Sequence, residues 1–154
     1  MKAAEGTVGR VFVLRLEDGD RIPDSIEAFA AARGIRGAFC ALVGGIGGGR
    51  LVVGPHSRDA LPVTPLVHEL LGVHEIAAVG TIFPSEDGSP RLHMHGALGR
   101  EGWTRTGCVR PGLEVWKLGE VVLLEILGAD LVRRRDPATG FEVLEPVSGG
   151  AGSE

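Results

Sequence analysis

The residues of this sequence with the clearest capacity for chemistry are His93 and His95, in the segment that runs from Arg91 to Leu98. Side chains two residues apart on a β-strand project from the same face, roughly 6.5–7 Å apart along the chain. Two imidazoles placed in this way can converge on one ion, with metal–nitrogen bonds of about 2.0–2.1 Å. The spacing therefore predicts half of a metal site.

Cys108 is the candidate for the next ligand, because a short turn after Leu98 returns the chain beside the histidines. If that turn is centred near Arg100 and Glu101, Cys108 pairs close to His93 and can face the same side. Two imidazoles and a thiolate suit zinc and leave a fourth position open, as catalytic zinc sites do. We hypothesise that His93, His95 and Cys108 bind Zn²⁺. The alternative is that the histidines hydrogen-bond to neighbours and that the cysteine packs as a small hydrophobe.

The other histidines have weaker chemical signatures. His74 is a candidate fourth ligand or a partner of the ligands, and the neighbouring Glu75 is the best candidate for a general base if water occupies an open zinc position. An alternative role for Glu75 is a charge at the sheet edge paired with an arginine. His56 and His68 are expected to be solvated.

The elements that must position these residues are one helix and seven or eight short strands. Apolar residues at helical spacing after Pro23 predict a helix near residues 24–33, which ends before Gly34. The strand candidates follow one another at near-regular spacing, so we expect an α+β fold with a curved, mostly antiparallel sheet. Residues 38–43 are apolar without alternation, which predicts a strand buried on both faces.

The glycine run at residues 44–49 follows that strand. A phosphate-binding loop would require a helix next, but the strand-like segment 50–53 follows instead, so a turn or bulge is the better interpretation. Trp103 and Trp116 are expected to be core or interface anchors rather than platforms for nucleic-acid bases.

Composition limits the classes of function. The 154 residues carry a formal net charge of -4, which does not favour nucleic-acid binding, and Arg133-Arg134-Arg135 is the one dense basic run. Two cysteines are too few for a disulfide framework, and neither a signal peptide nor an apolar run of about 20 residues is visible. The expectation is a cytoplasmic protein that does not engage a membrane.

Taken together, several segments resemble a known family in their order and spacing: 9–16, 29–35, 43–47, 71–82, 92–95 and 135–141. The chain is similar to stand-alone prokaryotic members of the plants-and-prokaryotes-conserved (PPC) domain family. The resemblance covers about residues 7–145 as one domain, and residues 146–154, rich in glycine and serine, are expected to form a flexible tail.

The resemblance implies a homotrimer with a curved antiparallel sheet and a binding function, with DNA binding as the role attached to the family. In plants, the domain follows AT-hook motifs, and no Arg-Gly-Arg-Pro core is present here. Prokaryotic relatives often carry a Gly-His pair where this chain has Gly107-Cys108. The expected function is a trimeric binding module, DNA-binding or regulatory, with a candidate zinc site. A zinc-dependent hydrolase or lyase acting on a small substrate is the alternative.

Overall fold

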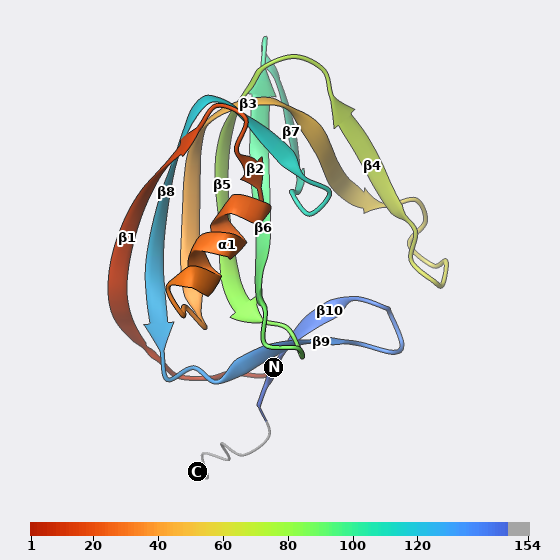
Figure 1. Ribbon diagram of the computed structural model, residues 1–154. Helices are drawn as coiled ribbons and strands as arrows, with labels where there is room; N and C mark the ends of the chain where they lie inside the picture. Colours follow the sequence, from red (N-terminus) through yellow and green to blue (C-terminus); the bar gives the residue numbers. More distant parts are fainter. Residues whose placement is uncertain (148–154) are drawn as a thin grey trace.

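A curved sheet of eight strands forms the body of the molecule, as seen in the computed structural model, which describes residues 1–147 (Figure 1). All of its strand pairs are antiparallel. The main path runs across β1 (Thr7–Glu17), β8 (Leu113–Leu127), β3 (Ala38–Pro55), β5 (His74–Pro84), β6 (Pro90–Arg100) and β7 (Trp103–Cys108). The short strands β2 (Arg21–Ile22) and β4 (Pro65–Leu70) pair with β8 and β3. The predicted fold class is confirmed.

The helix α1 (Asp24–Ala32) covers the concave face of the sheet. Ile26 and Ala30 are fully buried there, and the ring of Phe29 packs edge-on against that of Phe12, with the ring centroids 5.3 Å apart. Alternate residues of the strands complete this core, among them Leu42, Ile82 and Leu123. At nine residues, α1 is far shorter than the ~20 residues of a membrane-spanning helix, and no other helix occurs in residues 1–147.

The strand β3 is longer than expected, because the glycine run bends the strand without ending it. The segments predicted as two strands are one, and its register with β8 shifts between Gly44 and Gly48, which is the predicted bulge. A Cβ atom on Gly44 would lie 2.6 Å from the carbonyl oxygen of Leu118, so only glycine permits this approach. The end of β3 then reaches β7, where Val52 pairs with Cys108.

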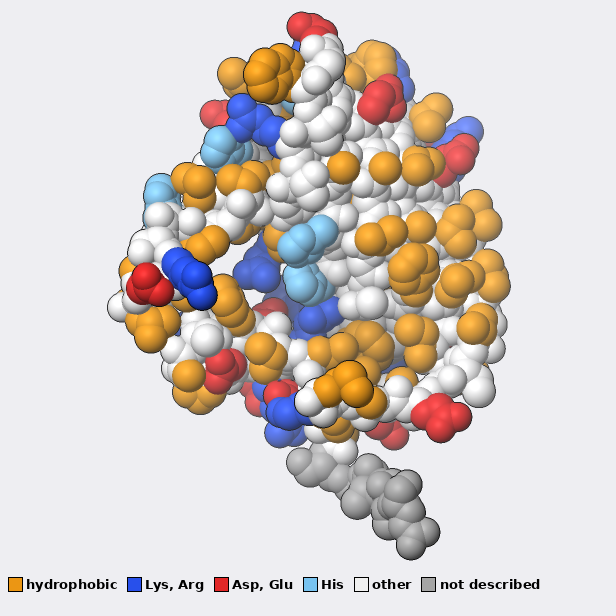
Figure 2. All heavy atoms as spheres, turned by 180° about the vertical axis from the view of Figure 1, so that it is seen from behind, with side chains coloured by type: hydrophobic (Ala, Val, Ile, Leu, Met, Phe, Trp, Pro, Cys, Tyr) orange, Lys and Arg blue, Asp and Glu red, His pale blue; other side chains and the backbone are white. Residues whose placement is uncertain are grey.

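The opposite face of the sheet, which we call the outer face, carries no helix within residues 1–147 (Figure 1). Hydrophobic side chains gather on this side of the molecule (Figure 2). One row of paired residues crosses it from β1 to β7: Val13, Val122, Ala41, Val79, His95 and Cys108. Phe39 and Val43 lie on the same face and are also exposed. The chain by itself therefore buries only one face of the apolar segment 38–43, whereas the sequence predicts burial on both.

A hairpin of β9 (Leu131–Arg135) and β10 (Glu142–Pro146) lies across one end of the sheet. Ser85 and Arg133 form the bridge that joins it to the end of β5. Residues 136–141 connect its two strands. Most of the predicted flexible tail, residues 148–154, lies outside the described residues, and Pro146 is the last residue of β10.

Candidate metal centre

His93 and His95 project from the outer face of β6 because this strand alternates strictly. Leu92 and Met94 point into the core, where they are buried, while the two histidines are exposed. Their Nε2 atoms lie 3.2 Å apart, and the ring centroids lie 5.1 Å apart. Two nitrogens bound tetrahedrally to one zinc ion at 2.0–2.1 Å would lie about 3.3 Å apart. The pair therefore already has the spacing of a zinc chelate.

Cys108 reaches the same face through the β6–β7 hairpin, although its register differs from the predicted one. The loop consists of Glu101 and Gly102, both with positive φ (50° and 81°), as a type I′ turn requires. Cys108 is therefore opposite His95, not His93. Moving the centre of a turn by one residue shifts the cross-strand partner by two, so the thiol stays on the predicted face.

The three side chains form a compact cluster. Their candidate ligand atoms all lie within 4.8 Å of one another, and residues 1–147 contain no other group of three or more histidine, cysteine or acidic side chains so placed. Cys108 is 7% exposed, whereas both imidazoles are open to solvent on one side. Two nitrogens and a sulfur are a donor set that fits zinc.

The surroundings of His93 favour the neutral imidazole. Partial burial lowers its pKa, and the nearby positive charges of Arg133, His95 and Arg110 lower it further. A neutral imidazole is the form that binds a metal, so this environment suits a ligand.

A cavity of about 750 Å³ opens beside the cluster, and His93, His95 and Cys108 form part of its wall. Figure 2 shows two adjacent histidine side chains between an apolar patch and a hollow that contains basic side chains. The basic residues that line the cavity are Arg110, Arg133 and Arg135. The site is thus a cationic cavity with three candidate metal ligands on one side.

Sequence reasoning noted Arg133-Arg134-Arg135 only as a run of charge and did not connect it with the metal ligands. The hairpin that carries it follows the sheet in sequence, and its position depends on long-range contacts with β5. Arg110 comes directly after the buried Val109, with no pattern that marks it.

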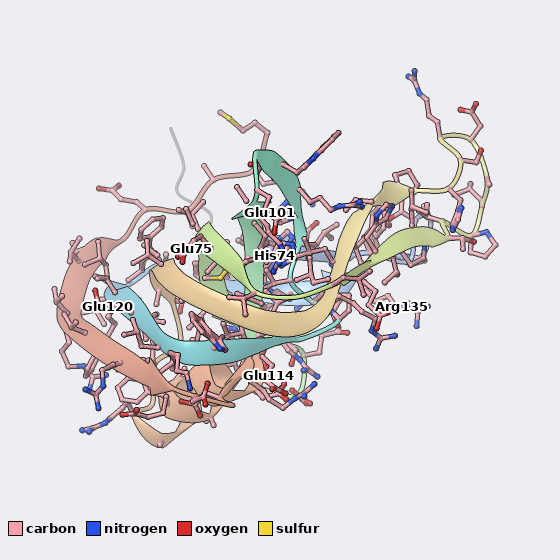
Figure 3. The ribbon with its side chains drawn as sticks, turned by 90° about the horizontal axis from the view of Figure 1, so that it is seen from above. His74, Glu75, Glu101, Glu114, Glu120 and Arg135 are labelled. Atoms are coloured by element: carbon pink, nitrogen blue, oxygen red, sulfur yellow. The ribbon has the colours of Figure 1, made fainter. Side chains whose placement is uncertain are left out.

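Two other candidate residues lie away from the cluster. His74 and Glu75 begin β5, where they pair with Ile46 and Gly99, four or five residues from the row that contains His95. At about 3.3 Å per residue, that is more than 13 Å along the strand. They lie with Glu101 at the end of the sheet from which Figure 3 is viewed, and His74 Nδ1 is 2.9 Å from the carbonyl oxygen of Gly72. Neither residue joins the candidate site.

The other two histidines and the two tryptophans singled out in the sequence all lie at the surface. His56 is exposed, and His68 contacts Arg105 on the surface. Trp103 and Trp116 are 81% and 43% exposed, so neither is a core anchor.

Comparison with known proteins identifies relatives of the same architecture. The family model described as the Plants and Prokaryotes Conserved (PCC) domain matches residues 3–127. A metal-containing protein from Archaeoglobus fulgidus superposes with a TM-score of 0.83 at 27% identity, over 94% of this chain and 99% of that one. A PPC protein from Pyrococcus horikoshii gives 0.81 at 23% identity, over 96% and 99% of the two chains. A candidate DNA-binding protein from Ralstonia eutropha JMP134 gives 0.68 at 22%, over 88% and 90%.

One curated protein also matches. The bifunctional protein GlmU of Synechococcus sp. (strain JA-3-3Ab) is 31% identical over 134 residues, which are 86% of this chain. The chain spans about a fifth of the length of that protein, since the match covers 20% of it.

Proposed function

This chain belongs to the Plants and Prokaryotes Conserved (PCC) domain family, and on that premise we propose that it is a homotrimeric binding module with a zinc ion held by His93, His95 and Cys108. The observation that carries the zinc proposal is the Nε2–Nε2 separation of 3.2 Å, beside a buried cysteine on the same face. The Archaeoglobus relative, described as metal-containing, supports it.

Zinc is the metal best suited to this donor set. A thiolate is a soft ligand and two imidazoles are borderline ones, a combination that zinc accepts and that Mg²⁺ or Ca²⁺ does not favour. With three protein ligands, a bound zinc ion would keep a position open for water or an oxygen ligand, and it would act there as a Lewis acid.

Elemental analysis of protein purified without a histidine tag tests the zinc site. We expect close to one zinc per chain, or uptake to that level when zinc is added. Less than about 0.1 metal per chain, with no uptake on adding zinc at a pH where the ligands are deprotonated, would rule out the site.

The homotrimer proposal is supported by the outer face. Val13, Val43 and Val79 are each more than half exposed, and Phe39 and Val122 extend the same surface. Monomeric proteins rarely leave a continuous apolar patch of this kind in water. Identical copies that cover it with their own outer faces would bury both sides of β3, as its sequence predicts.

DNA is the partner suggested by the description of the Ralstonia relative. The arginines near the site line a cavity, and the net charge of the chain is -4. We therefore expect no sequence-specific shift of AT-rich duplex in an electrophoretic assay. Binding that is lost by the time the salt is raised to about 100 mM would be non-specific, whereas a shift that survives physiological salt would establish a DNA-binding role.

The alternative of a zinc-dependent hydrolase or lyase receives one supporting observation, the cavity beside the open coordination position. It loses its candidate general base, because Glu75 lies at the far end of β5. The binding module is therefore the better supported function.

A further inference from the structure

Arg133 is the feature of the cavity that a zinc site does not explain. Its side chain is 5% exposed, and its guanidinium is held by three neutral acceptors. Nε donates to the carbonyl oxygen of Arg91 (3.4 Å), and Nη2 donates to the carbonyl oxygen (3.2 Å) and hydroxyl (3.0 Å) of Thr81. Within residues 1–147 no carboxylate lies within 4.0 Å of it. Glu142 attracts Arg133 only from a longer distance. A nearly buried cation without a carboxylate in contact is costly, so a negative ligand would stabilise it.

The remaining nitrogen of Arg133 is available to such a ligand. Nη1 makes no hydrogen bond within the described residues, and it is not among their buried unpartnered atoms. It therefore keeps some exposure to solvent, and Arg133 is one of the residues that line the cavity. Because the other two nitrogens are anchored, the position of Nη1 is fixed before any ligand arrives.

The charge of the cavity also favours a negatively charged ligand. Arg110, Arg133 and Arg135 line it, and Glu142 is the one acidic residue that does. Glu142 also lines the adjoining hollow, whose other acids, Asp24 and Glu27, lie near Arg21 (3.9 Å) and Arg91 (3.7 Å). A zinc ion with a single thiolate would add further positive charge, in a chain whose net charge is -4. The excess positive charge is thus local to this cavity.

The rest of the wall is apolar. It is formed on one side by the end of β3 and the loop that leads to β4, and on the other by the β9–β10 hairpin. Its apolar residues include Pro55, Pro62, Val63, Pro65, Phe141 and Val143. A volume of about 750 Å³, an apolar lining and a few fixed polar groups are typical of a small-molecule site.

We propose that this cavity binds a small organic anion, a carboxylate or a phosphate monoester with an apolar body. Its anionic group contacts Arg133 Nη1 beside the zinc position, and its apolar body packs against the proline and valine wall. Arg110 and Arg135 add charge around the anionic group. The inference deepens the proposed zinc module by naming its ligand class, although the arginine part of the site does not require the metal.

Titration calorimetry with three phenyl compounds tests this inference. Phenylacetate, phenyl phosphate and benzyl alcohol share the apolar ring and differ in the charged group. We expect at least one of the two anions to bind with one molecule per chain, roughly ten-fold or more tighter than benzyl alcohol. The anion that binds more tightly identifies the head group. Equal binding of the alcohol, or no binding of either anion, would overturn the proposal.

Neighbouring arginines supply a matched pair of variants. Arg133→Gln should weaken anion binding about ten- to a hundred-fold, whereas Arg134→Gln, on an exposed residue outside the cavity lining, should leave it unchanged. If Arg133→Gln fails to fold, Arg110→Gln and Arg135→Gln, both on exposed residues, should each weaken binding several-fold. Anion affinities unaffected by all of the cavity variants that fold would contradict the assignment.

Measuring the zinc-loaded and metal-free proteins separates this inference from the zinc site. Zinc uptake without anion binding would leave the metal centre intact and refute the anion site. Anion binding that depends on Arg133 in a chain that takes up no zinc would support the anion site and refute the metal centre.

Discussion

The three candidate ligands are positioned by different means. His93 and His95 are fixed relative to each other by the two-residue repeat of one strand, whereas Cys108 depends on the pairing of two strands. Imidazole and thiolate both bind zinc tetrahedrally, but their metal distances differ by only about 0.2–0.3 Å. An imidazole at position 108 could therefore occupy the coordination position of the thiolate.

The first prediction concerns these ligands. Cys108→Ala and His95→Ala should each lower zinc affinity by about a hundred-fold or more, since one of the three ligands is lost outright, whereas Cys108→His should retain affinity within about ten-fold. Competition with a chromogenic chelator measures the change. His56→Ala, on an exposed histidine away from the cluster, is the control. If Cys108→Ala bound zinc as tightly as the unaltered chain, the thiolate would not be a ligand.

A second residue-scale prediction concerns Glu125, which is buried at the edge of the core. Its carboxylate accepts bonds from Arg10 Nε (2.8 Å), Nη2 (2.6 Å) and the Arg10 backbone N–H (3.0 Å). The Arg10 side chain above all, and then its N–H, lowers the pKa of Glu125 from 4.5 to about 2. Because the pKa is lowered in the folded state, the stabilisation is fully present above pH 4.5 and is lost as the pH falls toward 2.

Glu125→Gln should therefore lower the free energy of unfolding at neutral pH by about 1–2 kcal/mol, a modest value because the Arg10 side chain is half exposed. Urea denaturation at several pH values measures it, and the loss of stability between pH 4.5 and 2 should be smaller in the variant. Glu17→Gln removes an exposed partner of Arg15 on the same strand and should change little. Equal effects of the two substitutions would argue against a specific role for the buried pair.

At the scale of elements, the sequence predicts the alternation of buried and exposed side chains along β6, but it does not predict the register of the β6–β7 hairpin. The pattern of Leu92, His93, Met94 and His95 alone predicts which side chains share the outer face. The turn was harder to locate, because Glu101 adopts a positive φ that asparagine or glycine usually takes. The arginines of the cavity could not be assigned at all, since the position of β9 relative to β6 depends on contacts between residues about 50 apart, such as Thr81 and Arg133.

The third prediction follows from that turn. Gly102→Val places a β-branched residue at φ 81°, which should cost about 1–2 kcal/mol and favour other loop registers. Thermal unfolding with and without zinc should then show a smaller zinc-induced stabilisation than in the unaltered chain. Gly88→Val is a matched control, because Gly88 has φ 83° and equally open surroundings but lies in the β5–β6 turn. The prediction fails if zinc stabilises both variants equally.

At the scale of the whole molecule, the candidate metal centre lies at the margin of the outer face. The row that begins with Val13 on β1 passes through Val122 and Val79 and ends at His95 and Cys108. An apolar surface that leads into a metal site would let a neighbouring copy shield the cavity from water. Burial of the central strand on both faces, predicted from residues 38–43, is then a property of the assembly.

The fourth prediction tests this arrangement. Val13 is 75% exposed and Val79 is 57% exposed in the single chain, so glutamate at either position has no folding penalty from the core. In a trimer joined by outer faces, the same substitution would bury an unpaired charge at each contact, which is strongly unfavourable. Val13→Glu combined with Val79→Glu should therefore convert the three-chain mass measured by light scattering to that of one chain, with an unchanged circular dichroism spectrum. Leu61→Glu is the control, since Leu61 is 70% exposed on the β3–β4 loop and should leave the trimer intact. A trimer that persists in the double variant would show that the interface lies elsewhere. If the chains separate, their zinc affinity would show whether the three ligands bind the metal without a neighbouring copy.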